Sequence, residues 1–222
     1  MRSPKAGQYR AETTITVTKA TMNNSPPFNP NTAVAYGSFQ SPATPTRLLE
    51  LSAVSGSNRD CVLGLGSNLG NRLAYLRGAV RQLQLHAQIT AISALYETDA
   101  VGPAQPDYLN AAIRLRTALE PLALLEVQLG IERASGRVRL ERWGPRTLDL
   151  DLLFIFGEAV AEPGLVVPHA ELTRRAFALL PLLDVMPDAQ DPLTGVRYSE
   201  FATGLDRTGV RELPNSRAGW LE

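Results

Sequence analysis

The sequence predicts an α+β protein: a ferredoxin-like βαββαβ core with an antiparallel sheet covered by helices, plus a C-terminal helix. Apolar or alternating runs at residues 61–66, 89–97, 109–117 and 148–156 have the length and composition of strands. The segments that follow the first and the third run carry apolar residues at helical spacing. The order strand, helix, strand, strand, helix, strand is that of a ferredoxin-like core.

The two helices of this core have separate local signals. The first should follow the turn GSNLGNR and carry an apolar face from Leu73 to Leu83. Pro121 suits the first turn of the second helix, which should end near Gly136. The additional C-terminal helix is expected around residues 173–180.

The chain divides into three parts of unequal composition. Residues 1–59 are rich in Ser, Thr, Pro and Asn, which predicts a mostly disordered extension with a short strand at Thr13–Lys19. An organelle-targeting segment, or a translation start at Met22 or later, are the alternative interpretations. Residues 60–204 should form the folded domain and residues 205–222 a polar tail.

Composition excludes some classes of function. Lysine and arginine together number 22, as do aspartate and glutamate, so no global attraction to nucleic acid is encoded. No apolar stretch approaches the length of a membrane span. The single cysteine, Cys61, begins an apolar run and cannot form an internal disulfide. A buried thiol fits a reducing compartment, so we expect a cytoplasmic protein.

Two aspartates mark the candidate site. Asp149 and Asp151 alternate with leucines, so in a strand both carboxylates lie on one face, with Cα atoms about 6.5–7 Å apart. Such a pair can hold a hard cation. Four arginines stand just upstream and could hold phosphate oxygens: Arg137, Arg139, Arg142 and Arg146. The alternative is a surface strand whose aspartates form salt bridges with these arginines.

The run RWGPRTLDLD at residues 142–151 resembles the signature of the 6-hydroxymethyl-7,8-dihydropterin pyrophosphokinases of folate synthesis. Three further segments follow that family's order: GLGSNLGNR at 64–72, PDYLNAA at 106–112 and VPHAELTRRAF at 167–177. The resemblance spans about residues 61–202. It implies a transfer of pyrophosphate from ATP to the 6-hydroxymethyl group of the dihydropterin, with release of AMP.

The resemblance also implies a set of pterin-binding residues. A flat, nitrogen-rich ring needs aromatic faces for stacking and an amide for its edge. The implied residues are Thr98, Val101, Tyr108, Asn110, Trp143 and Phe177. The alternative for Tyr108 and Phe177 is a place in the core, whereas an amide such as Asn110 within a strand needs hydrogen-bond partners.

For the nucleotide, the resemblance implies Arg137 and Arg146 as catalytic residues at the reacting phosphates. Arg139, His169 and Arg175 would bind ATP, and Asp149 and Asp151 would ligate two Mg²⁺ ions. Glu132 either contacts the site or is a solvated surface carboxylate. Gly64, Gly66 and Gly70 are expected in a tight turn from strand to helix that forms one wall of the pocket.

Some positions depart from the family's pattern. Asp99 stands where many relatives carry proline, and Leu129 and Leu140 replace polar or basic residues.

The expected partners are the two small substrates alone, with no nucleic acid and no membrane, and the expected state is a monomer. An RNA-binding module would need exposed aromatics and a basic face, and neither is visible in the sequence. The intact Asp/Arg set argues against a catalytically inactive, regulatory relative.

Overall fold

The computed structural model describes residues 58–100, 104–137 and 144–221. Its main sheet has six antiparallel strands in the order β5-β1-β4-β3-β8, with β2 paired to β4 beside β3. The bounds are β1 (Arg59–Ser67), β2 (Gln88–Ile92), β3 (Tyr96–Thr98), β4 (Tyr108–Thr117), β5 (Asp149–Ile155) and β8 (Val210–Glu212). The predicted α+β core is confirmed.

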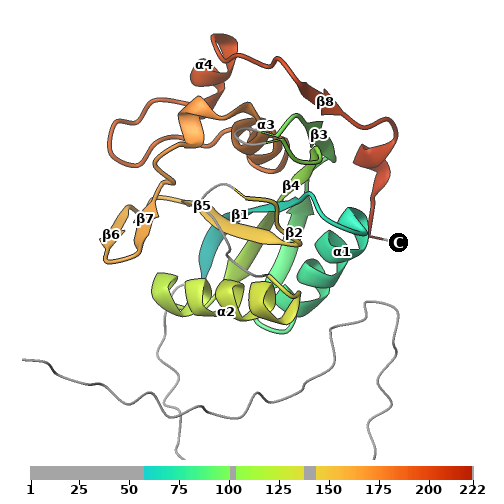
Figure 1. The fold of residues 1–222 in the computed structure, drawn as a ribbon. Coiled ribbons are helices and arrows are strands. Elements are labelled where there is room, and N and C mark those ends of the chain that lie inside the picture. Colours follow the sequence, from blue (N-terminus) through green and yellow to red (C-terminus); the bar gives the residue numbers. More distant parts are fainter. Residues whose placement is uncertain (1–57, 101–103, 138–143, 222) are drawn as a thin grey trace, which may run out of the picture.

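Helices cover both faces of this sheet (Figure 1). The helices α1 (Arg72–Leu83) and α2 (Pro121–Ala134) pack on one face, as predicted. On the other face lie α3 (Ala176–Val185) and α4 (Tyr198–Thr203), which pack against a second buried cluster. The sheet is therefore the middle layer of three, and the C-terminal helix closes the face that the first two leave open.

Smaller elements connect these layers. A separate hairpin pairs β6 (Val160–Glu162) with β7 (Leu165–Val167) and projects beyond the end of β5 (Figure 1). Two 3₁₀ turns, η1 (Leu172–Arg174) and η2 (Ser216–Ala218), precede α3 and the C-terminus respectively. No helix within the described ranges combines the length and the apolar character that crossing a membrane requires. The short strand expected at residues 13–19 lies outside the described residues.

The strand expected at 89–97 is two strands. The pairing of β2 with β4 shifts between Ile89 and Ala91, and the ladder then breaks before β3 begins. At the break, the Ser93 hydroxyl accepts a hydrogen bond from the Ala112 backbone N–H at 2.8 Å. A serine side chain that satisfies backbone groups in this way offers an alternative to regular pairing, which apolar periodicity does not reveal.

The segment after residue 204 packs onto the domain and does not extend as a polar tail. Its strand β8 pairs with β3, and the buried Trp220 joins the core cluster that α1 and α2 form with the sheet. The Trp220 indole N–H donates to the Ser93 carbonyl at 2.9 Å, and the Arg77 side chain donates to the Trp220 carbonyl at 2.6 Å. Sequence polarity hid this because the apolar contacts come from a few separated residues, the large Trp220 with Leu213 and Leu221.

We expect Trp220→Ala to lower the free energy of unfolding by roughly 3–4 kcal/mol, the usual cost of truncating a buried aromatic. Chemical denaturation followed by circular dichroism measures this. Leu193→Ala is the control, because Leu193 is 77% exposed and its truncation should change little. A Trp220→Ala variant as stable as Leu193→Ala would contradict the packing role of the C-terminal segment.

Candidate active site

The strand β5 presents Asp149 and Asp151 on the sheet face that also carries α3. The alternate residues Leu150 and Leu152 are buried on the opposite face, as the pattern predicted. The neighbouring strand β1 places Gly66 beside Asp149 and Gly64 beside Asp151. These glycines place no side chain of their own beside the two carboxylates, and the Leu153 side chain packs against Gly64.

Gly64 and Gly66 therefore lie inside β1, within the strand expected at residues 61–66, and the expectation that these two glycines belong to the turn is wrong. A Cβ atom at Gly66 would lie 3.0 Å from the side-chain oxygen of Asn110, so the site is closely built around this position. The turn into α1 instead uses Gly70, whose φ of +62° is a conformation that suits glycine. The glycines of the strand and the glycine of the turn belong to the same run, GLGSNLGNR, and their spacing alone does not show which of them lie in the strand.

Two arginines hold Asp149. The Arg137 side chain donates to one carboxylate oxygen at 2.7 Å and the Arg146 side chain to the other at 2.8 Å. All three side chains are largely buried or half-buried. Burial opposes the charge on Arg146, but the neighbouring carboxylate of Asp149 outweighs it and raises the pKa of Arg146. One carboxylate thus orients both guanidinium groups.

Glu132 supports this arrangement from the end of α2. It is only 3% exposed, accepts a hydrogen bond from the Leu150 backbone N–H at 2.8 Å, and forms a salt bridge with Arg137. The interpretation of Glu132 as a solvated surface carboxylate is therefore wrong. Burial raises its pKa, against the lowering effects of the Leu150 N–H and Arg137. Glu132 ties α2, β5 and Arg137 into one unit.

Asp151 carries the charge that the arginines leave uncompensated. Within the described ranges it makes no salt bridge, and its side chain is exposed. Desolvation by the surrounding protein, followed by repulsion from the charges of Asp149 and Glu132, nevertheless raises the pKa of Asp151 to about 7. An exposed carboxylate that resists ionisation beside a second carboxylate is a suitable ligand for a hard cation, whose charge relieves the repulsion.

The cation would need ligands beyond these two aspartates. Among the described residues, no group of three or more His, Cys, Asp or Glu side chains is arranged to hold a metal ion. Mg²⁺ characteristically uses one or two carboxylates and completes its coordination with water and phosphate oxygens. The donor set therefore fits a cation that arrives with a phosphorylated ligand.

Asn68 links the arginine segment to the neighbouring loop. Its side-chain oxygen accepts from the Arg146 backbone N–H at 2.7 Å, and its amide nitrogen donates to Gln105 at 2.9 Å and to the Pro106 carbonyl at 3.0 Å. Its backbone N–H donates to the Arg146 carbonyl at 3.1 Å. Asn68 stands within GSNLGNR, but it was not among the predicted site residues.

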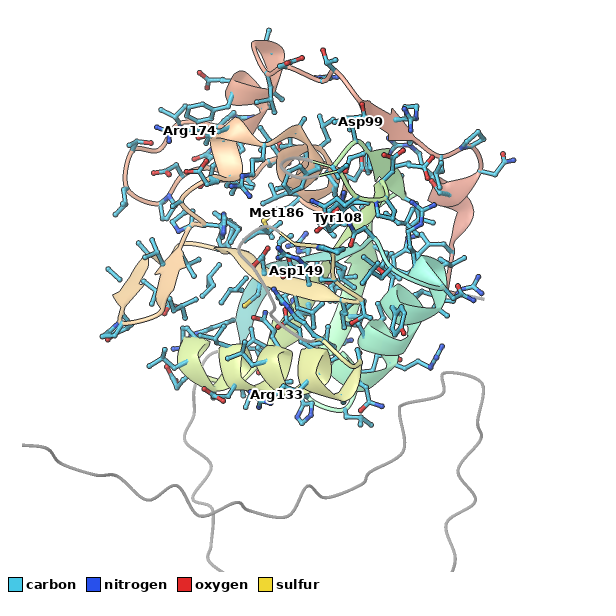
Figure 2. The ribbon with its side chains drawn as sticks, viewed as in Figure 1. Asp99, Tyr108, Arg133, Asp149, Arg174 and Met186 are labelled. Carbon is cyan, nitrogen blue, oxygen red and sulfur yellow. The ribbon has the colours of Figure 1, made fainter. Side chains whose placement is uncertain are left out.

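Three of the predicted pterin residues meet beside this charged cluster. The Asn110 amide donates to the Thr98 hydroxyl at 2.7 Å, and both side chains are buried. Tyr108 pairs with Thr98 across β3 and β4, and its hydroxyl lies 3.5 Å from the Gly144 carbonyl. Burial raises the pKa of Tyr108. Figure 2 shows Tyr108 close to Asp149 at the centre of the molecule.

The model of one protein family, 7,8-dihydro-6-hydroxymethylpterin-pyrophosphokinase (HPPK), matches residues 62–187. This chain belongs to the HPPK family. A 2-amino-4-hydroxy-6-hydroxymethyldihydropteridine pyrophosphokinase of Synechocystis is 42% identical over 151 residues, covering 67% of this chain and 77% of the relative. That of Methylorubrum extorquens is 43% identical over 154 residues, covering 68% of this chain and 96% of the relative.

A solved structure of wild-type Plasmodium falciparum HPPK-DHPS has the same fold. The TM-score is 0.54 at 15% sequence identity, and the match covers 66% of this chain and 44% of that one. This chain thus spans less than half the length of that protein, and the likeness concerns the fold alone.

His169, one of the residues predicted to bind ATP, lies directly beside β5. The His169 backbone N–H donates to the Leu153 carbonyl of β5 at 2.9 Å, directly after a cis Val167–Pro168 peptide. Burial, and then the charge of Arg175, lower the pKa of His169. Its Nδ1 accepts from the Glu171 backbone N–H at 3.3 Å, so the neutral ring carries its proton on Nε2.

Phe177 and Arg175 form a pair at the start of α3. The Arg175 guanidinium lies over the Phe177 ring at 5.7 Å from its centroid. Phe177 is partly buried against the cluster formed by α3 and α4, so both the core and the binding interpretation retain support. Val101, Arg139 and Trp143 lie outside the described residues.

We expect Asp151→Asn to stabilise the metal-free protein. The pKa of Asp151 is higher in the folded protein than in the unfolded chain, so the ionised carboxylate destabilises the fold. This cost in folding free energy is absent below the unfolded-state pKa and grows as pH rises to about 7. After discounting for solvent screening of this exposed group, the gain above neutral pH should be about 1 kcal/mol.

Urea unfolding in EDTA, at about pH 8 and again near pH 4, measures this gain. It should be largest at the higher pH and disappear at the lower. Asp188→Asn is the matched control, since Asp188 is 89% exposed and 3.7 Å from its partner Arg197. A constant effect of Asp151→Asn at both pH values would contradict the crowding of negative charge at the site.

Proposed function

We propose that this chain transfers the pyrophosphoryl group of ATP to the hydroxymethyl oxygen of 6-hydroxymethyl-7,8-dihydropterin, forming AMP and the dihydropterin diphosphate in folate biosynthesis. One observation carries the proposal. The Asp149 carboxylate with its two bound arginines stands on the same sheet face as the Thr98–Asn110 pair, which is suited to a heterocyclic edge. Membership of the HPPK family supports the same reaction.

Pterin recognition falls to the β3–β4 side of the site. The Asn110 side chain retains an oxygen and one N–H beyond its bond to Thr98, so it can both accept from and donate to a ring edge. Tyr108 and Phe177 are proposed to flank the ring with their aromatic faces. Val101 and Trp143, outside the described residues, complete the proposed set.

ATP binding falls to the basic residues. Arg137 and Arg146 present planar guanidinium groups that can exchange part of their contact with Asp149 for phosphate oxygens. Neutral His169 can donate its Nε2 proton to a phosphate without adding charge, and Arg175 supplies a cation nearby. Arg139, outside the described residues, is proposed as a further nucleotide contact.

Asp149 and Asp151 are proposed to hold two Mg²⁺ ions, which when bound would neutralise charge on the ATP phosphates. The fit rests on hard oxygen donors, on the exposure of Asp151 and on the excess negative charge that raises its pKa. In the Mg²⁺-bound enzyme both carboxylates would be ionised, so metal binding should weaken as pH falls.

The protein's contribution to the reaction is positioning and charge. The hydroxymethyl oxygen attacks the β-phosphorus while AMP departs, and little covalent chemistry falls to side chains in such a transfer. Arg137 is held between Asp149 and Glu132, so its guanidinium is pre-oriented before substrate arrives. Pre-oriented cations at the point where negative charge develops lower the barrier without reorganising during the reaction.

We also propose that the protein acts as a cytoplasmic monomer. The large exposed apolar side chains are dispersed over the sequence and over separate elements, among them Leu85, Phe156 and Leu193. Cys61 is a buried free thiol whose pKa burial raises to about 12, in keeping with a reducing compartment and an unreactive structural role.

The decisive experiment is AMP release from ATP, measured with and without the dihydropterin and with and without Mg²⁺. Wild-type protein should release AMP only when all components are present. Asp151→Asn should reduce the rate by roughly a hundredfold or more, since the metal's charge stabilisation would be lost. Asp188→Asn should retain wild-type activity. AMP release that is independent of pterin, or an active Asp151→Asn variant, would contradict the proposal.

Arg137→Ala should lower kcat by roughly a hundredfold while raising KM for ATP by less than about tenfold, because its charge acts mainly in the transition state. It should also lower stability, since the buried Glu132 loses its cation. Initial-rate kinetics below the variant's unfolding temperature separate the two effects. Arg133→Ala is the control, because exposed Arg133 lies on the outer side of α2 (Figure 2). A raised KM for ATP with unchanged kcat would identify Arg137 as a simple binding residue.

A further inference from the structure

We propose that Arg211, on the C-terminal strand β8, is a positioning residue for the pterin site: it holds both ends of the segment that joins β3 to β4. This inference rests on the proposed function and extends it to a residue outside the catalytic cluster. The sequence analysis placed Arg211 in a polar tail.

The geometry begins with the very short strand β3. It spans three residues and lies between β4 and β8, with Thr98 paired to Tyr108 on one side and to Val210 on the other. Thr98 and Tyr108 are therefore the last paired residues before the connecting segment leaves the sheet. The positions of Thr98 and Tyr108 therefore depend on the contacts of the residue that follows Thr98 and of the residue that precedes Tyr108.

Those two residues are Asp99 and Asp107, and Arg211 contacts both. Its guanidinium lies 3.5 Å from the Asp99 carboxylate and 3.3 Å from the Asp107 carboxylate. A third carboxylate, that of Glu97 directly across the sheet from Arg211, lies 3.6 Å away. One cation thus bridges the start and the end of the connecting segment.

The backbone of β8 adds a second link at Asp99. The Asp99 backbone N–H donates to the Gly209 carbonyl at 3.0 Å. A proline at position 99 could not make this bond, because it has no backbone N–H. Gly209 has a φ of +72°, and a Cβ there would lie 2.5 Å from the Asp99 carboxylate, so only glycine permits this approach. The C-terminal segment is fitted closely to the start of the connection.

Charge balance explains why the arginine matters. Glu97, Asp99 and Asp107 bring three carboxylates to one edge of the sheet. Arg72, at the start of α1, neutralises Glu97 at 2.8 Å and donates to the Asp107 carbonyl at 2.8 Å. It makes no contact with the Asp99 or Asp107 carboxylates, whose salt bridges within the described ranges are those to Arg211. Without Arg211 these two carboxylates would repel each other across the ends of the segment.

The consequence reaches the site through Thr98 and Tyr108. Each is adjacent in sequence to an aspartate that Arg211 holds, and Thr98 also accepts the Asn110 amide bond at 2.7 Å. Loss of the Arg211 contacts should therefore loosen the Thr98–Asn110 pair while leaving Asp149, Arg137 and Arg146 in place. Pterin binding should weaken and the chemical step should not.

The test compares Arg211→Ala with wild-type protein in two measurements. Hydrogen exchange of the Asp99 backbone N–H reports the link to Gly209 directly and should become faster. In initial-rate kinetics, KM for the pterin should rise roughly three- to fivefold, the scale of an exposed ion-pair network, with kcat and KM for ATP little changed. Arg211→Lys should restore most of both properties.

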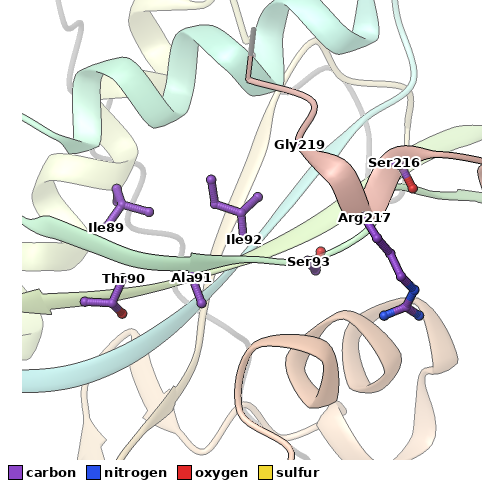
Figure 3. A pocket seen from close by; sticks show the side chains of 8 residues that line it. All are labelled: Ile89, Thr90, Ala91, Ile92, Ser93, Ser216, Arg217 and Gly219. Atoms are coloured by element: carbon purple, nitrogen blue, oxygen red, sulfur yellow. The ribbon is translucent and has the colours of Figure 1, made fainter.

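Arg217→Ala is the matched control from the same segment. Arg217 is as exposed as Arg211 and also binds carboxylates, Glu212 at 2.6 Å and Asp184 at 3.0 Å, but it contacts neither Asp99 nor Asp107. Figure 3 shows it extending toward α3 from the rim of the hollow beside β2. This variant should lose at least as much stability as Arg211→Ala without altering pterin KM or Asp99 exchange.

Several results would contradict the proposed role of Arg211. Unchanged Asp99 exchange in Arg211→Ala would overturn the positioning role, and faster exchange with unchanged pterin KM would overturn its link to the substrate. Equal effects of Arg217→Ala would reduce Arg211 to a general stabiliser of the C-terminal segment. If the wild type releases no AMP, the proposed function fails, and calorimetric titration of the dihydropterin replaces KM. Unaltered pterin affinity, or none in the wild type, would then overturn the inference.

Discussion

The balance of charge around Asp149 is the constraint on which the site depends. Among the described residues, three carboxylates, those of Glu132, Asp149 and Asp151, meet two guanidinium groups, those of Arg137 and Arg146. The arginines compensate the two inner carboxylates and leave Asp151 in excess. A cation with phosphates would complete this balance, because the cation meets the carboxylates and the phosphates meet the arginines. This balance of charge agrees with the proposal that both ligands bind together.

The sheet supplies this charge cluster by using its two faces differently. On one face the leucines of β5 pack with α1 and α2 into a continuous core. On the other face, Gly64 and Gly66 of β1 lie beside the aspartates, and α3 and α4 pack against the second buried cluster. A Cβ atom would lie 3.2 Å from the Leu153 side chain at Gly64 and 3.0 Å from the Asn110 side-chain oxygen at Gly66, so both positions are closely packed.

The sequence correctly predicts those elements whose signal is local. Alternation of Asp and Leu placed both aspartates on one face, and periodicity gave the order of the core strands and helices. It failed where a contact joins distant segments: Glu132 is buried because Arg137 and the Leu150 N–H reach it, and Asn68 matters because it holds Arg146. The tail looked polar because its apolar contacts come from a few separated residues, Trp220 with Leu213 and Leu221, and the break at Ser93 follows from a side-chain hydrogen bond that composition does not encode.

The role of the C-terminal segment follows from how little else holds β3. Three residues of strand form few ladder bonds, and a strand so short gains its order from its neighbours. β4 fixes one side of β3, while β8 fixes the other and brings Arg211 to the two aspartates beyond its end. The Asp149 cluster has no such dependence, because β1 and Glu132 of α2 hold it. The fold would thereby separate the two proposed binding tasks: phosphates and cation at β5, the edge strand of the sheet, and the pterin beside β3 and β4, where β8 completes the sheet.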